Sequence, residues 1–288
     1  MASSGSTTDA TTTTPGAQSP GSRIALAVGV YLCWTVATWA LEGRLLTLQR
    51  PGAAVDRLAY TAVANVLIGT LVALWVVRVF AASGAVSRAR LGLRSLRHTL
   101  LASVGGAAAG FALYLVQGPP TTDPVVLANA FAQMLPVSIA EIVVCWMLVG
   151  GSVEAALRGR VPDVAARTGA LVAASILFGL YHFAHSPPFD TTAMVGLLTL
   201  VSVGTGAVFF GGRSAYGALV FHNFLALFGV TSALADAGRL VAYRDPAVSL
   251  LVTGLVALLI FVVAESLGVR DASGSTAGND GSVELLRQ

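Results

Sequence analysis

Long apolar runs recur through most of this 288-residue chain, and they constrain its fold more than any other feature. A helix needs about 20 mainly apolar residues to cross the hydrocarbon core of a bilayer, at a rise of about 1.5 Å per residue. Because charged residues make up only 11% of the sequence, the chain lacks the polar surface of a water-soluble protein. The sequence therefore predicts an all-α, polytopic bundle of membrane helices. Seven windows have the required length, at residues 24–42, 59–77, 99–117, 164–184, 191–211, 215–235 and 247–268.

An eighth span is expected in the stretch from Pro124 to Arg158, which is longer than one crossing requires. Pro136 lies inside this stretch, and a proline removes a backbone hydrogen-bond donor and clashes with the preceding helical turn. Pro136 should therefore break or kink a helix here, and we expect an interfacial or re-entrant piece at 124–134 and a membrane span at 137–157.

Polar segments flank the apolar body at both ends. Residues 1–22 are almost entirely Ser, Thr, Gly, Ala and Pro, with no positively charged region ahead of an apolar one. This composition predicts a disordered tail and not a cleavable signal peptide. Residues 269–288 form a second polar tail, so the transmembrane domain is expected to cover residues 23–268.

The basic residues are all arginines, 17 in number, and their distribution predicts the orientation in the cell membrane. Eight spans place both tails on one side, which would carry twelve arginines against five on the other side. Because arginine-rich flanks are retained in the cytoplasm, both termini are expected to be cytoplasmic. The arginines lie in loops between apolar spans, which indicates a lipid bilayer as the partner of the basic segments and argues against nucleic acid.

Two histidines, His182 and His222, lie inside apolar spans. An ionisable side chain at membrane depth is costly and must find a partner, so such residues are commonly functional. Their positions in the sequence place His182 toward the outer half of the membrane and His222 nearer its middle. Because imidazole is the commonest nitrogen ligand of metals and two such residues suggest a shared site, both are candidate metal ligands.

A catalytic metal site also needs a carboxylate and a water, and two glutamates precede the histidines. Glu141 and Glu154 are 13 residues apart, about 20 Å along a continuous helix, so they cannot both serve one site. Glu141 lies near the expected depth of His182. Glu154 lies about one turn from the cytoplasmic end of its helix, where an i, i+4 pair with Arg158 would also explain it. Depth favours Glu141, and both glutamates are candidate catalytic residues.

Other polar residues near these positions have simpler explanations. Asn223 either orients substrate or a water, or forms a hydrogen bond between helices. His185 and Asp190 belong to the short segment HSPPFD at the end of a span, where a solvated histidine and a turn acid are expected. Cys33 and Cys145 are expected to be packing residues.

These residues, in this order, resemble the CPBP family, the CAAX-protease and bacteriocin-processing intramembrane metalloproteases. The family pattern is a paired-glutamate EExxxR motif, then FxxxH, then a histidine followed four residues later by Asn or a similar polar residue. The sequence FGLYH at residues 178–182 matches the second motif in full. GTGAVFFGGRSAYGALVFHNFLALFG, at residues 204–229, resembles the third block, and the resemblance covers roughly residues 136–230.

The first and third motifs depart from the family pattern. Aligning VEAALRG on the first motif makes Glu154 its second glutamate and Arg158 its arginine, but it places Val153 where the first glutamate is expected. Aligning the first motif on Glu141 instead keeps the glutamate at the expected membrane depth, but it leaves the motif without its partner glutamate and its arginine. In the third motif, Ala226 stands where Asn is usual.

The resemblance implies a zinc-dependent intramembrane endopeptidase acting on membrane-associated peptides or proteins, with prenylated termini as the substrates that the family name suggests. In this reading His182 and His222 bind the metal, and Glu141 positions or deprotonates the attacking water. A second hypothesis is a catalytically inactive member that acts as a membrane scaffold or immunity-type interaction protein, which the altered first motif favours. A third is a transporter that relays protons through the same three residues, although the sequence shows no repeat or pair of broken helices that would indicate one.

Overall fold

The computed structural model describes residues 19–43 and 54–267, and helices are the regular elements of these two ranges. Eight of the helical segments are long and apolar enough to cross a membrane, which confirms the expected multi-pass bundle. The described part of residues 1–22 already belongs to the first helix from Pro20 onward, and the tail expected at 269–288 lies outside the described residues. The eight segments are Pro20–Gly43, Val55–Ala82, Leu96–Val116, Pro124–Leu157, Asp163–Ala184, Thr192–Gly212, Ala215–Asp236 and Val248–Glu265.

Several of these segments combine α-helix with a short π-helical or 3-10 stretch, labelled η. The elements in chain order are α1 (Pro20–Thr38), η1 (Trp39–Gly43), α2 (Ala54–Tyr60), η2 (Thr61–Val72), α3 (Ala73–Ala82), α4 (Leu96–Val116), α5 (Pro124–Glu141), η3 (Ile142–Gly150), α6 (Gly151–Leu157), α7 (Asp163–Tyr181), η4 (His182–Ala184), α8 (Thr192–Gly212), α9 (Ala215–Asp236), η5 (Leu240–Tyr243) and α10 (Val248–Glu265).

The segment from Pro124 to Leu157 differs from the expectation of two separate pieces. α5, η3 and α6 form one helical span of 34 residues, and Pro136 lies inside α5. The predicted break at Pro136, and with it a separate piece at 124–134, is therefore wrong. In the most apolar window of this span 94% of the residues are buried, so other helices enclose it. Packing against neighbouring helices lets a membrane helix tolerate the one backbone hydrogen bond that a proline removes.

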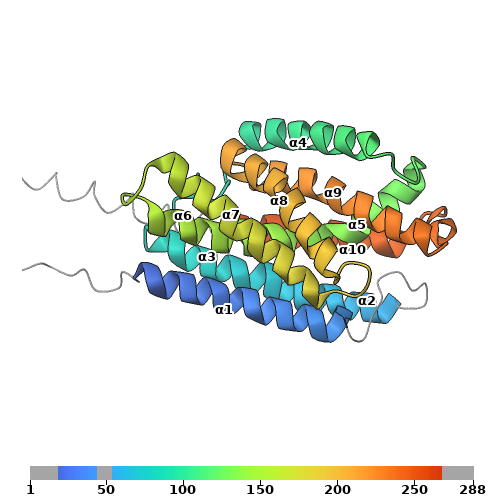
Figure 1. Ribbon diagram of the computed structural model, residues 1–288, viewed down its shortest axis with the longest axis horizontal. Coiled ribbons are helices and arrows are strands. Elements are labelled where there is room, and N and C mark those ends of the chain that lie inside the picture. Colours follow the sequence, from blue (N-terminus) through green and yellow to red (C-terminus); the bar gives the residue numbers. More distant parts are fainter. Residues whose placement is uncertain (1–18, 44–53, 268–288) are drawn as a thin grey trace, which may run out of the picture.

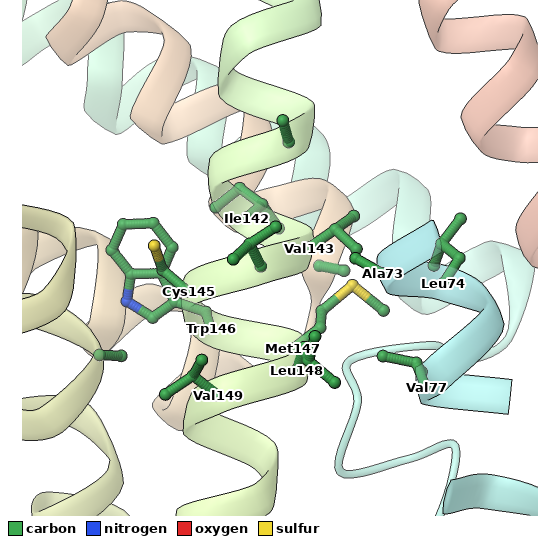
Figure 2. Packing of buried hydrophobic residues seen from close by; sticks show 14 of the residues in the cluster. Ala73, Leu74, Val77, Ile142, Val143, Cys145, Trp146, Met147, Leu148 and Val149 are labelled. Carbon is green, nitrogen blue, oxygen red and sulfur yellow. The ribbon is translucent and has the colours of Figure 1, made fainter. Parts of the chain in front are cut away.

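The middle of this span, η3, is apolar on every side, and it lies buried within the bundle. All nine of its residues are buried, as expected of a helix without a polar face. Figure 2 shows Trp146 and Met147 on opposite sides of this helix, with Met147 facing Ala73 and Val77 of α3. Trp146 packs toward Phe178 of α7, with ring centroids 5.2 Å apart. Helices α3 and α7 thus pack against η3, which directly follows Glu141.

α4 lies along one edge of the bundle and packs against α9, while α1 lies along the opposite edge (Figure 1). A Cβ added to Gly106 of α4 would lie 2.3 Å from the backbone oxygen of Gly217 in α9, so the two backbones approach too closely for a larger residue. Small residues allow such contacts between membrane helices. The outer face of α4 exposes apolar side chains such as Leu101 and Val104, as expected of a surface in contact with lipid.

Candidate metal centre

Three residues singled out in the sequence meet inside the bundle. Glu141 is the last residue of α5, His182 is the first residue of η4, and His222 lies in α9. All three are buried, and they line one cavity of about 100 Å³. The structure therefore brings together the acid and the two histidines that the sequence predicts to share one site.

His222 is held in place through both of its ring nitrogens. Nε2 lies 2.8 Å from Oε2 of Glu141, and Nδ1 lies 2.9 Å from Oγ1 of Thr205. A tautomer with the proton on Nε2 donates to the carboxylate and accepts from the threonine hydroxyl at Nδ1. The ring also packs against Trp146 and Phe178, with centroids 5.3 and 5.2 Å away. His222 thus orients the Glu141 carboxylate and has no ring nitrogen left over.

His182 uses one ring nitrogen for support and leaves the other for the cavity. Its Nδ1 lies 2.8 Å from the backbone oxygen of Phe178, so Nδ1 carries the proton and donates. The neutral ring then keeps a lone pair on Nε2. Phe178 also packs against the imidazole in an edge-to-face contact, with centroids 4.6 Å apart. The four-residue spacing of FxxxH therefore has a physical reason, because one helical turn supplies both the carbonyl and the ring.

His185, expected to be a solvated loop residue, is instead a buried neighbour of His182, so that expectation is wrong. Its side chain is 7% exposed, and its ring stacks on that of His182 with centroids 4.9 Å apart and planes 23° from parallel. The short 3-10 turn η4 after α7 folds the chain back, which places His185, three residues after His182, on the same side as His182. His185 Nδ1 lies 3.4 Å from Oε2 of Glu42.

Glu42 is the site residue that sequence reasoning missed. It lies in η1 at the end of the first span and is buried, and its carboxylate accepts hydrogen bonds from the backbone N–H and the hydroxyl of Ser186, at 2.9 and 2.5 Å. An acid at the end of an apolar run, two residues before Arg44, is typical of an interfacial residue, so the sequence gives no signal of this contact. The partners are 144 residues apart in the chain.

Glu141, His182 and His185 form a group whose potential ligand atoms all lie within 4.8 Å of one another. Within the described residues this is the one group of three or more His, Cys, Asp or Glu side chains found with that spacing. Two imidazoles and one carboxylate match the donor set of catalytic zinc sites, which keep a further position for water or substrate. His222 lies outside this group, and its role as a metal ligand stays a prediction.

Glu154 and Arg158 lie away from the cavity and do not pair with each other. Glu154 is buried and bonds Arg213 through both carboxylate oxygens, at 2.7 and 2.5 Å. Arg158 instead lies 3.6 Å from Asp163. The expected i, i+4 pair of Glu154 with Arg158 is therefore wrong, because the helix ends at Leu157 and Arg158 adopts an extended backbone that turns it toward α7. Glu154 ties α6 to the end of α8.

Asn223 bonds a neighbouring helix, which is one of the two roles considered for it. The Ser138 hydroxyl donates to its Oδ1 at 2.8 Å, and its Nδ2 donates to the backbone oxygen of Phe131 at 3.0 Å. Both partners belong to α5, so Asn223 fastens α9 to the helix that carries Glu141. Asn223 is fully buried and does not line the cavity.

The rest of the cavity wall is largely apolar. It is formed by side chains of α5, α8 and α9 beyond the cluster of polar groups, and Ala226 leaves room where the family pattern has a larger polar residue. The cavity thus combines a few converging polar groups with an apolar surface, which is typical of a small-molecule or peptide site. These apolar lining residues include Met134, Val137, Leu198, Val201, Leu225 and Val230.

Comparison of the chain with protein-family models, with curated proteins and with solved structures finds no match.

Proposed function

We propose that this protein is a membrane-embedded, zinc-dependent endopeptidase that hydrolyses peptide bonds of membrane-associated substrates, and that it is a divergent member of the CPBP family. One observation carries the proposal. Glu141, His182 and His185 converge on a cavity with a largely apolar wall, inside helices long enough to cross a bilayer.

The side chains present fit a divalent metal in number, type and protonation. The Nδ1 of His182 is occupied by a backbone carbonyl, which leaves the Nε2 lone pair as a donor. The Nε2 of His185 is buried and has no hydrogen-bond partner among the described residues, which is rare for a buried polar atom. Zinc bound to such a set lowers the pKa of a bound water toward about 7 and polarises a carbonyl oxygen.

Glu141 is the residue that would position or deprotonate the attacking water. Its Oε2 accepts a hydrogen bond from Nε2 of His222, which fixes the plane of the carboxylate. Thr205 in turn fixes the His222 ring. A positioned carboxylate acting as a general base typically contributes roughly 10²–10⁴-fold to a hydrolytic rate.

The apolar wall supports a substrate that carries apolar side chains next to the bond that is cut. Such a segment would leave lipid and enter the cavity with little desolvation cost, whereas a polar segment would lose its hydration. We also propose that the protein resides in the cell membrane with both termini in the cytoplasm, an orientation that the arginine distribution supports.

The proposal is tested by reconstituting the full chain in liposomes with internally quenched apolar peptides. Cleavage is expected in the wild type, is expected to fall to background in Glu141→Gln and His182→Ala, and is expected to stop on chelation and return with zinc. His98→Ala is a matched control, because His98 lies in the first turn of α4, with its Nε2 3.0 Å from the backbone oxygen of Gly212, and does not line the cavity. Cleavage that survives His182→Ala would contradict a metal mechanism, and a folded wild type that cleaves no peptide would favour the scaffold hypothesis.

A further inference from the structure

The carboxylate of Glu42, at the end of the first span, contacts the loop after α7. Glu42 accepts two hydrogen bonds from Ser186 and lies 3.4 Å from Nδ1 of His185. Both oxygens of the carboxylate are used, so its orientation is fixed. Glu42 thus contacts two consecutive residues, because His185 directly precedes Ser186 in the chain.

Close backbone packing brings the two segments together. A Cβ added to Gly43 would lie 2.3 Å from the backbone oxygen of Ala184 and 3.5 Å from that of His185. Only a glycine fits this contact without movement of one of the backbones. Gly43, the neighbour of Glu42 in sequence, therefore sets how near the Glu42 carboxylate comes to His185.

The ring nitrogens of the three cavity histidines divide into two kinds. In His222 both nitrogens have partners, Thr205 and Glu141. The Nδ1 atom of His182 faces the backbone oxygen of Phe178, and the Nδ1 atom of His185 faces the carboxylate of Glu42. The Nε2 of His185 is buried without a hydrogen-bond partner in the described ranges. Metal-ligating histidines commonly direct their second ring nitrogen at a carboxylate or a backbone carbonyl, which fixes the tautomer.

We infer that His185, and not His222, supplies the second imidazole of the metal site, and that Glu42 is the positioning residue that directs Nε2 of His185 toward Glu141 and His182. The two imidazoles that hold the metal are then those of His182 and His185, which stack on each other in one turn of chain, and Glu141 keeps its role toward the attacking water. His222 keeps its role as the hydrogen-bond donor to Glu141. The inference rests on the proposed function, because it requires that the cavity bind a metal.

The test uses the purified full-length protein and needs no peptide substrate. Zinc affinity is measured by competition with a chromophoric chelator, and the number of imidazole ligands is measured by X-ray absorption at the zinc edge. Wild type is expected to show two imidazoles, His185→Ala one, and His222→Ala two. Glu42→Gln, which keeps the shape of the side chain, is expected to keep the stoichiometry and to weaken zinc binding by roughly 10–100-fold.

The outcomes separate this inference from the proposed function. A wild type that binds no zinc ends the proposed function itself. A wild type with two imidazoles that keeps both in His185→Ala, or that loses one in His222→Ala, overturns the assignment of the ligand. Unchanged affinity in Glu42→Gln overturns the positioning role. If Glu42→Gln does not fold, Ser186→Ala removes one of the two bonds to Glu42 and is expected to weaken binding roughly fivefold, so unchanged affinity there has the same meaning.

Discussion

The buried pair between Glu154 and Arg213 allows a quantitative test of how this bundle is held together on the side away from the cavity. The two side chains are only 4% and 13% exposed, and they share two short hydrogen bonds. Glu154→Ala leaves the guanidinium of Arg213 buried without its counter-charge. Breaking a buried pair in this way costs about 3–5 kcal/mol, because the remaining charge stays desolvated.

A loss of that size is large enough to measure by thermal unfolding in detergent. For a chain of this length each kcal/mol shifts the midpoint by roughly 2–4 °C, so Glu154→Ala is expected to lower it by roughly 6–20 °C. Arg158→Ala is the matched control. Its partner is 3.6 Å away and the two side chains are 30% and 58% exposed, so the expected loss is within about 1 kcal/mol.

The comparison also decides between the two possible partners of Glu154. Equal losses in Arg158→Ala and Glu154→Ala, or a loss below about 1 kcal/mol in Glu154→Ala, would refute the argument from burial and geometry. Zinc binding is expected to persist in folded Glu154→Ala protein, because Glu154 does not line the cavity.

Two further predictions concern the first span and the segment before the last one. Gly43→Ala is expected to weaken zinc binding, because the added Cβ would lie 2.3 Å from the backbone oxygen of Ala184. In Gly29→Ala, in the same span, the added Cβ meets no atom within 4 Å, so the zinc affinity should stay unchanged. Equal affinities in the two variants would refute this. Burial raises the pKa of Tyr243 above its ordinary value of 10.0, against the opposing effects of Arg57 and Gln133. Its neutral phenol therefore contributes stability that is complete below pH 10 and is lost as the pH rises above it, so Tyr243→Phe should show a shallower fall of the unfolding midpoint above pH 10; identical slopes would exclude this role.

The membrane spans could be predicted from the sequence because span length and apolar composition are local properties. The expected depth of Glu141 near that of His182 could also be worked out, since residues per span convert directly into distance along the membrane normal. The proline argument failed at Pro136 for a related reason. A proline costs a helix one backbone bond wherever it occurs, but whether the helix continues depends on the helices packed around it.

The contacts that complete the site could not be predicted, because they join segments that are distant in the chain. Glu42 meets Ser186 across 144 residues, and Glu154 meets Arg213 across 59. His185 follows the end of a span, which predicts a solvated residue, and nothing in its local sequence shows that η4 turns it back toward His182. The family pattern offered no help, since neither Glu42 nor His185 belongs to its motifs.

The metal content of purified protein tests the central claim most directly. After saturation with zinc and removal of the excess, elemental analysis is expected to find one zinc per chain in the wild type and in His98→Ala, and none in His182→Ala. A wild type without stoichiometric metal, or a His182→Ala protein that retains it, would contradict the account.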